Sequence, residues 1–496
     1  MSVDGIKSEL WSAGEAAAAT GGHSTLPWLA RGVSIDSRAV VAGDLFVALK
    51  GPNFDGHAFV ADALAKGAVA ALVSVRPGDV GEGAPLLVVG DTLDALRMLG
   101  QAARRRTSAK VIAVTGSVGK TGVKEALLSC LADQAPTYAT VGSLNNHWGV
   151  PLSLARLPAY CRFGVFELGM NHAGEIGQLS RMVRPDVGLI TIVAPAHMEF
   201  FSSLEAIADA KAELFEGMDG DGVSILNHDN PQFQRLQAVA LGRGIRQIWS
   251  FGHDERADAR VLGYSSGADG SVVTAVIAGE PIRYVVSLPG AHWVMNSLAV
   301  LLGVRALGGD VHAAALSLAA LAPVKGRGTR KRIIFKQGAF TLIDESYNAS
   351  PEAMSAAFSV LASTEPESGG RRLVVLGDMR ELGERSDDFH ADLLAPLVEA
   401  GVDGVFCSGP HMAALFERLP ARMRGCYAAD SMALIPEVVR AVRAGDVVLV
   451  KGSAGSRMGA VVSALASLDA NNASNANNDS GKWESCRSAA PAVATA

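Results

Sequence analysis

The segment TGSVGKT at 115–121 constrains the fold of this chain more than any other feature. It follows the apolar run KVIAV at 110–114, which predicts a strand, and it opens a segment at 120–132 that predicts a helix. Backbone N–H groups of such a loop, together with a helix N-terminus, bind phosphate oxygens. The sequence therefore predicts a parallel α/β domain that binds a nucleotide phosphate.

Within this loop, Lys120 is predicted to contact the β- and γ-phosphates and Thr121 to ligate Mg²⁺. Val114 stands where the full G-x-x-x-x-G-K-[ST] pattern has its first glycine, so a glycine turn with a chance lysine is the alternative. The strand before the loop and the helix after it favour the phosphate site. The predicted nucleotide contacts are Thr115, Gly116, Ser117, Val118, Gly119, Lys120 and Thr121.

The segments around this loop alternate between strand and helix. Strands are predicted at 163–168 and 187–192, and helices at 174–183 and 204–216. Such alternation favours a parallel sheet with right-handed crossovers. At 260–288 two turn signals, Asp269-Gly270 and Gly279-Glu280, separate alternating runs and predict a small antiparallel patch before a helix at 292–306.

The chain of 496 residues is long enough for about three domains. We predict a first domain at 1–106, a central domain at 107–324, a third domain at 325–468 and a disordered tail at 469–496. The basic run Arg104–Arg106 is interpreted as an exposed linker, and the Gly-rich segment 323–329 as a second linker. In the first domain, Ser12 and Glu15 have the spacing of a helix capping box.

Strands are expected at 44–49 and 69–75 in the first domain, with a helix at 58–69 between them. In the third domain they are expected at 340–344, 372–376, 402–407 and 446–450, with helices between them.

Composition excludes several classes of protein. A net charge of −6 makes the chain a poor candidate for a nucleic-acid binder. The five cysteines are widely spaced without a C-x-x-C pair, which is typical of a reducing compartment. No apolar run is long enough for a membrane-spanning helix, and the first residues lack the apolar stretch of a secretory signal. We therefore expect a cytoplasmic protein.

Other polar residues stand where ligands bind α/β sheets. Glu167 ends a predicted strand and could ligate Mg²⁺, whereas a solvated carboxylate or a helix cap is the alternative. His197 ends the next βα turn, where a structural role is equally open. Taken alone, Lys211 within a predicted helix indicates a solvated face, and Asn145 and Asn146 indicate a turn. The sequence has no G-x-G-x-x-G, N-K-x-D or H-E-x-x-H motif, so dinucleotide, GTPase and zinc-protease sites have no support.

A set of motifs in fixed order gives the chain a family resemblance over roughly residues 30–465. In addition to the phosphate loop the chain contains SLNNHWGVP, FELGMNHAGEI, VAPAHMEFF, AKAELF, LPGAHWVMN, KGRG, LIDESYNASP and LGDMRELG. Together they resemble the ATP-dependent Mur ligases. LIDESYNASP and LGDMRELG are most similar to the branch that adds D-Ala-D-Ala.

The resemblance implies a fold and a reaction. The fold would have an N-terminal α/β domain for the UDP end of the substrate, a central ATP-binding P-loop domain and a C-terminal Rossmann-like domain. The terminal carboxylate of UDP-MurNAc-tripeptide would attack the γ-phosphate of ATP, and D-Ala-D-Ala would then attack the acyl phosphate. Phosphoryl transfer depends mainly on positioning and charge neutralisation, which Lys120 and two Mg²⁺ ions would provide.

The resemblance also implies roles for single residues. Thr121 and Glu167 would hold one Mg²⁺, and His197 and a carbamylated Lys211 would help to hold the second. Asn296 would contact adenine, and Arg327 and Asp344 would contact phosphates and ribose. Asn145 and Asn146 would face the muramoyl peptide, and Ser37 and Arg38 the uridine.

Two positions depart from the family pattern. Trp293 stands where the family usually has asparagine, and Arg457 is displaced by three residues in KGSAGSR. Two other functions remain open: a related ligase for another amino acid, such as a folylpolyglutamate synthase, and a P-loop ATPase that forms no amide. We expect a monomer. The sequence does not distinguish meso-diaminopimelate from lysine as the third residue of the peptide.

Overall fold

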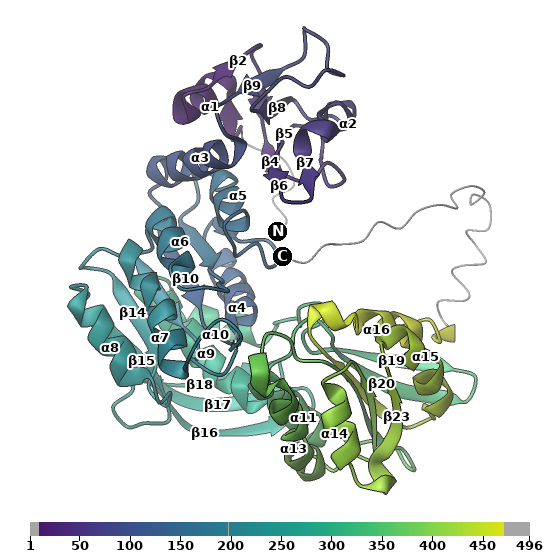
Figure 1. The fold of residues 1–496 in the computed structure, drawn as a ribbon. Coiled ribbons are helices and arrows are strands. Elements are labelled where there is room, and N and C mark those ends of the chain that lie inside the picture. The colour runs from purple at the N-terminus through teal and green to yellow at the C-terminus, as the bar shows by residue number, and fades with distance from the viewer. Residues whose placement is uncertain (1–8, 197, 471–496) are drawn as a thin grey trace.

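The computed structural model describes residues 9–196 and 198–470, which form three α/β domains in chain order (Figure 1). Each domain has its own sheet, of five, nine and six strands respectively. The predicted three-domain α/β architecture is confirmed. The positions of its domain boundaries stay predictions.

The N-terminal domain is built on a sheet in the order β2-β9-β8-β5-β4, parallel except at β2. The first helix begins with the predicted capping box, because Ser12 and Glu15 each bond the other's backbone N–H, and it ends at Gly21 in the left-handed conformation. The elements are β1 Trp11–Ser12, α1 Ala13–Thr20, β2 His23–Ser24, β3 Leu29–Ala30, β4 Gly32–Ser34, β5 Asp44–Val47, β6 Lys50–Gly51, β7 Phe54–Asp55, α2 Val60–Ala65, β8 Ala70–Val73, β9 Leu86–Val88 and α3 Thr92–Arg106.

The exposed linker predicted at Arg104–Arg106 is wrong. These residues form the last turn of α3, which Asp91 caps at its start. Arg104 donates to the carbonyl oxygens of Val183 and Arg184 at 2.8 and 2.9 Å, and Arg106 stacks over the Trp11 ring. A run of three arginines predicts a solvent-exposed segment, but here the long side chains cover the junction between two domains.

The central domain has β10 in the middle of a parallel arrangement, β11-β12-β10-β13-β14-β15, which continues into the antiparallel β16-β17-β18. The predicted antiparallel patch is thus an extension of the main sheet. The elements are β10 Lys110–Thr115, α4 Lys120–Ala132, β11 Thr137–Ala139, α5 Gly149–Ala155, β12 Phe163–Glu167, α6 Glu175–Val183, β13 Val187–Ile190, α7 Leu204–Ala212, β14 Val223–Asn227, α8 Phe233–Gly242, β15 Gln247–Gly252, β16 Ala259–Gly267, β17 Gly270–Ile277, β18 Glu280–Val286, α9 Ala291–Ala306 and α10 Val311–Leu318.

The C-terminal domain has the strand order β19-β20-β24-β21-β22-β23, with β19 antiparallel and the others parallel. Its elements are β19 Thr329–Phe335, β20 Gly338–Glu345, α11 Pro351–Ala362, β21 Arg372–Gly377, α12 Ser386–Ala391, α13 Leu394–Glu399, β22 Gly404–Ser408, α14 Met412–Arg418, β23 Arg424–Ala428, α15 Ser431–Ala441, β24 Val447–Lys451 and α16 Gly459–Ala466. Short 3₁₀ turns occur at Gly56–Phe59, Glu213–Gly217, Gly383–Arg385, Ala421–Met423 and Ala454–Ser456.

Among the residues described, no helix has the length and apolar character needed to cross a membrane. Disorder is predicted for the tail at 469–496, and residues 471–496 lie outside the described residues. Asp469 belongs to the described part, where it is buried and pairs with Lys331 at 3.0 Å.

Candidate active site

The phosphate loop connects the central strand β10 to α4, so it lies at the carboxyl edge of the central sheet (Figure 1). Gly116 and Gly119 have φ values of +145° and +90°, which side chains rarely adopt, and this explains the two glycines. Lys120 begins the helix, and its Nζ donates to the carbonyl oxygen of Gly116 at 2.6 Å. The lysine therefore folds back over the loop, where a phosphate would meet it.

The loop is fixed to the neighbouring strand by side-chain bonds. Thr191, just past β13, donates to the carbonyl oxygen of Val118 at 2.6 Å. Ser117 donates to Ala194 O at 2.8 Å and accepts from Ala194 N at 3.0 Å. A Cβ added to Gly116 would lie 2.0 Å from Thr191 Oγ1, so this contact excludes any larger residue. The loop is thus held in shape before any ligand binds.

Glu167 ends β12 next to the loop and is almost fully buried. Its Oε1 accepts from Asn145 Nδ2 at 2.7 Å, while its Oε2 is buried and has no hydrogen-bond partner among the described residues. An unpaired buried carboxylate oxygen is costly unless something else compensates its charge. Thr121 is also buried here, and carboxylate and hydroxyl oxygens are ligands that Mg²⁺ accepts. The residues present therefore fit the predicted magnesium ion.

Lys211 lies in α7 with 2% of its surface exposed, so the alternative of a solvated helix face is wrong. Burial lowers its pKa well below the usual value, and the charge of Lys120 lowers it further. In the part of the chain that the structure describes, its ammonium makes no hydrogen bond or ion pair. A neutral buried amine is the form that captures CO₂, so the environment fits the carbamylation that the resemblance implies.

The pKa of Lys120 is itself lowered, by burial first; the carboxylate of Glu167 opposes this shift and Arg327 adds to it. Arg327 is thus near enough to influence Lys120, although it belongs to the segment that joins the central and C-terminal domains. Its guanidinium lies 4.5 Å from the centre of the Tyr347 ring. The structure brings the linker to the phosphate site.

Two more predicted residues lie at this junction. A Cβ on Gly119 would be 3.3 Å from Asn296 Oδ1, which places the Asn296 amide against the loop. Asp344 is near the end of β20, and its carbonyl oxygen accepts from Gly328 N at 2.9 Å, beside Arg327. Its carboxylate accepts from both donors of Ser346.

The other predicted residues have separate positions. His197 lies outside the described residues. Asn146 stabilises the turn before α5, since its Oδ1 accepts from Trp148 N and Gly149 N at 3.1 and 2.9 Å. Ser37 and Arg38 lie in the N-terminal domain, where Arg38 pairs with Asp36. The structure does not bring these two to the phosphate loop.

Sequence reasoning missed two residues that shape the site. One is Thr191, described above. The other is Lys124, a fully buried lysine whose Nζ donates to the carbonyl oxygens of Thr140 and Gly142 at 2.7 and 3.0 Å. It anchors the loop that leads to Asn145. Its position one helical turn after Lys120 was the available signal, because a lysine on the inner face of α4 requires a partner.

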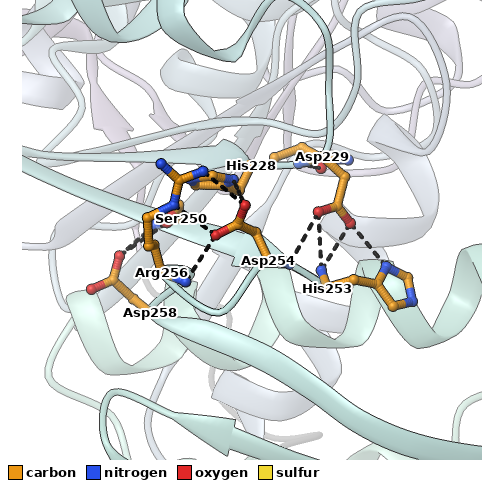
Figure 2. Close-up of polar contacts among 8 residues, drawn as sticks. His228, Asp229, Ser250, His253, Asp254, Arg256 and Asp258 are labelled. Atoms are coloured by element: carbon orange, nitrogen blue, oxygen red, sulfur yellow. Dashed lines mark hydrogen bonds and ion pairs between the residues drawn. The ribbon is translucent and has the colours of Figure 1, made fainter.

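A second polar cluster lies at the carboxyl ends of β14 and β15, further along the same sheet edge (Figure 2). Its carboxylates are already paired within the cluster. Asp229 accepts from the backbone and ring of His253, and Asp254 from the Arg256 guanidinium at 2.8 Å. Within the described ranges no group of three or more His, Cys, Asp or Glu residues could hold a metal ion. The cluster therefore fastens two strand ends together.

Comparison with known families gives three consecutive matches. Residues 30–107 match the Mur ligase family catalytic domain, residues 114–304 the Mur ligase middle domain, and residues 329–454 the Mur ligase glutamate ligase domain. The three matches follow the order of the three sheets.

Individual proteins agree with these matches. The chain is 37% identical to UDP-N-acetylmuramoyl-tripeptide–D-alanyl-D-alanine ligase of Escherichia coli, over 87% of this chain and 93% of that protein. Among solved structures, MurF from Acinetobacter baumannii is 31% identical with a TM-score of 0.80, covering 92% of this chain and 99% of that one. MurF ligase from Thermotoga maritima in complex with ADP is 28% identical with a TM-score of 0.72, covering 88% and 97%.

Proposed function

Since the chain belongs to the Mur ligase family, we propose that it is an ATP-dependent ligase that joins D-alanyl-D-alanine to UDP-N-acetylmuramoyl-tripeptide. The observation that supports this most is that similarity to ligases of this name extends over nearly the whole length of both chains. The phosphate loop, the unpaired Glu167 oxygen and the buried Lys211 supply the site that such a reaction requires.

The first step activates a carboxylate. The terminal carboxylate of the tripeptide attacks the γ-phosphorus of ATP, the bond to the bridging oxygen breaks, and ADP leaves. Lys120, the N-terminus of α4 and Arg327 place positive charge where charge develops on the transferred phosphoryl group. The MurF ligase of T. maritima, which this chain resembles, was solved in complex with ADP, the nucleotide that this step would release.

The second step forms the amide. The free amine of D-Ala-D-Ala attacks the acyl carbon, inorganic phosphate leaves, and the amine loses a proton. The acyl phosphate reacts readily with water, so the site must hold it away from solvent until the amine arrives. The end of β20 is bonded to the linker that carries Arg327, and Arg327 is near Lys120, so the C-terminal domain would bring the acceptor.

We propose two Mg²⁺ ions for this site. Thr121 and Glu167 would hold one, and His197 and the carbamate of Lys211 would help to hold the other. When bound, the ions would neutralise phosphate charge. Carbamylation converts a buried cation, which this environment disfavours, into an anion that can bind a metal.

We further propose that the N-terminal domain holds the UDP end of the substrate, with Ser37 and Arg38 near uridine, and that Asn145 and Asn146 face the peptide. Asn296 would contact adenine, and Asp344 the ribose or phosphates. The enzyme would act in the cytoplasm as a monomer. Its domain boundaries would lie near residues 106 and 324.

The decisive experiment measures phosphate release with ATP, Mg²⁺ and UDP-MurNAc-tripeptide, with and without D-Ala-D-Ala. We expect release only when tripeptide nucleotide and dipeptide are both present, together with a pentapeptide product by mass. Single amino acids serve as controls. Phosphate release that requires a single amino acid would indicate a related ligase. Phosphate release that is the same with and without D-Ala-D-Ala or a single amino acid would indicate an ATPase. Comparing meso-diaminopimelate and lysine tripeptides identifies the third residue.

A further inference from the structure

The loop at 378–386 joins the C-terminal domain to the central domain. It leaves the end of β21 and reaches the segment just after His197, where Glu199 N donates to the carbonyl oxygen of Glu381 at 3.1 Å. Gly383 lies against the same backbone, since a Cβ added to it would be 3.3 Å from Glu199 Cα. The contact is made by backbone atoms, so a change in the backbone conformation of the loop would break it.

The loop adopts a conformation that requires support. Glu381 has a φ of +63°, in the left-handed region that residues with a side chain rarely occupy, and Gly383 follows at +67°. A non-glycine residue in this region is strained and persists only where its surroundings impose it. Something in the domain must therefore impose this shape.

His390, in α12, is completely buried and bonds both ends of the loop. Its Nε2 accepts from Met379 N at 2.9 Å, and its Nδ1 donates to the carbonyl oxygen of Ser386 at 2.6 Å. These two bonds require a neutral ring with its proton on Nδ1, because a protonated ring would direct an N–H at the N–H of Met379. The imidazole spans the base of the loop.

The surroundings keep this ring in place. Asp378 approaches Nε2 only to 3.9 Å and accepts from Met412 N at 2.9 Å instead. His411 stacks on His390 with ring centroids 5.6 Å apart, and it is bonded to Asp387 at 2.8 Å. Burial lowers the pKa of His390, which agrees with the neutral form that the geometry requires.

We propose that His390 is a positioning residue for ligation: by bonding both ends of the 378–386 loop, it gives the loop the shape that docks on Glu199. It touches no reacting group. The effect of His390 on catalysis rests on the proposed function. The docking of the loop on Glu199 does not, because it involves no substrate.

The test is hydrogen exchange of backbone amides in the full-length protein without substrates. His390→Asn keeps a donor near the Nδ1 position and loses the acceptor for Met379, whereas His390→Gln keeps an acceptor near the Nε2 position. We expect His390→Asn to speed exchange of both the Met379 and Glu199 amides by about tenfold, and His390→Gln to speed it much less. His312→Asn, an exposed histidine on α10, is the matched control and should change neither amide.

Faster exchange at Met379 with unchanged exchange at Glu199 would overturn the proposal, because it would separate loop shape from docking. If His390→Asn fails to fold, Gly383→Val tests the same contact from the outer side: Glu199 exchange should rise while Met379 stays protected. Protection of both amides in Gly383→Val would also overturn it.

Kinetics provide the second readout. We expect His390→Asn to lower kcat for pentapeptide formation by about tenfold and to leave KM for ATP unchanged, with partial recovery in His390→Gln. An unchanged kcat in a folded His390→Asn protein that has lost the Glu199 contact would contradict a role in ligation. If the wild-type protein forms no pentapeptide but shows the exchange pattern, the proposed function fails and the docking role stands.

Discussion

Two lysines of opposite character lie near one another at the phosphate site. Lys120 is bonded to the loop that it serves, whereas Lys211 is buried without a hydrogen bond or ion pair among the residues that the structure describes. The charge of Lys120 adds to the burial that lowers the pKa of Lys211. The pKa of Lys120 is lowered by burial and by Arg327, and Glu167 opposes that shift. Bound phosphate would favour the charge of Lys120, and carbamylation would remove that of Lys211.

We expect Lys120→Ala to lower kcat for ATP-dependent ligation by about 10²–10³-fold, as is typical when one donor to a developing charge is removed. Phosphate release measures the loss. Thermal unfolding should show an intact fold, because among the described residues the Lys120 ammonium bonds only carbonyl oxygens of its own loop. Turnover close to wild type would refute the assignment of the phosphate loop.

We expect Lys211→Ala to lose activity and to regain part of it when acetate or formate is added, because a small carboxylate can replace the carbamate in the space that the side chain leaves. The measurement is phosphate release against carboxylate concentration. Chloride at equal ionic strength is the control. Full activity without any additive would show that Lys211 has no functional role.

At the scale of elements, the phosphate loop depends on one close contact between β10 and the end of β13. We expect Gly116→Ala to lower the free energy of unfolding by about 1–3 kcal/mol and to weaken ATP binding, because its Cβ would meet Thr191 Oγ1 at a φ of +145°. Urea unfolding and ATP titration measure the two effects. Gly14→Ala, in the open first turn of α1, is the matched control and should not destabilise the protein.

The 378–386 loop leads to a prediction for pH. The folded-state pKa of His390 is below its unfolded value of about 6.5, so the unfolded chain binds more protons as pH falls. The stabilisation is therefore complete above this value and is lost as pH falls through the folded-state pKa. We expect the free energy of unfolding, measured with urea between pH 7 and 5, to fall less steeply in His390→Gln. Equal slopes in both proteins would contradict a neutral His390.

Local signals and tertiary contacts account for different parts of the site. The phosphate loop was predictable because glycines, lysine and the flanking strand and helix are contiguous, and the capping box because it spans four residues. The burial of Lys211 and the helical end at Arg104–Arg106 were not, because both depend on elements distant in sequence. The strands β14 and β15 were missed, since short apolar segments give weak periodicity.

At the scale of the whole molecule, the segment between the central and C-terminal domains contributes a charge to the phosphate site. We expect Arg327→Ala to raise KM for ATP at least tenfold, because its guanidinium is near Lys120 and stacks on Tyr347. Initial rates against ATP concentration measure this. Arg332→Ala, on the exposed face of β19 where it pairs with Glu367, should leave KM unchanged. Equal KM values for both variants would remove Arg327 from the nucleotide site.

The position of Arg327 in the connection between two domains has a thermodynamic consequence. In the proposed function, Arg327 joins the two domains and also binds ATP, which makes the angle between the domains a variable of the binding equilibrium. Any molecule that favours one interdomain angle must then change the affinity for ATP, and ATP must change the affinity for that molecule by the same factor. An inhibitor that wedges the two domains apart, without entering the nucleotide pocket, would therefore weaken ATP binding through the linker that carries Arg327.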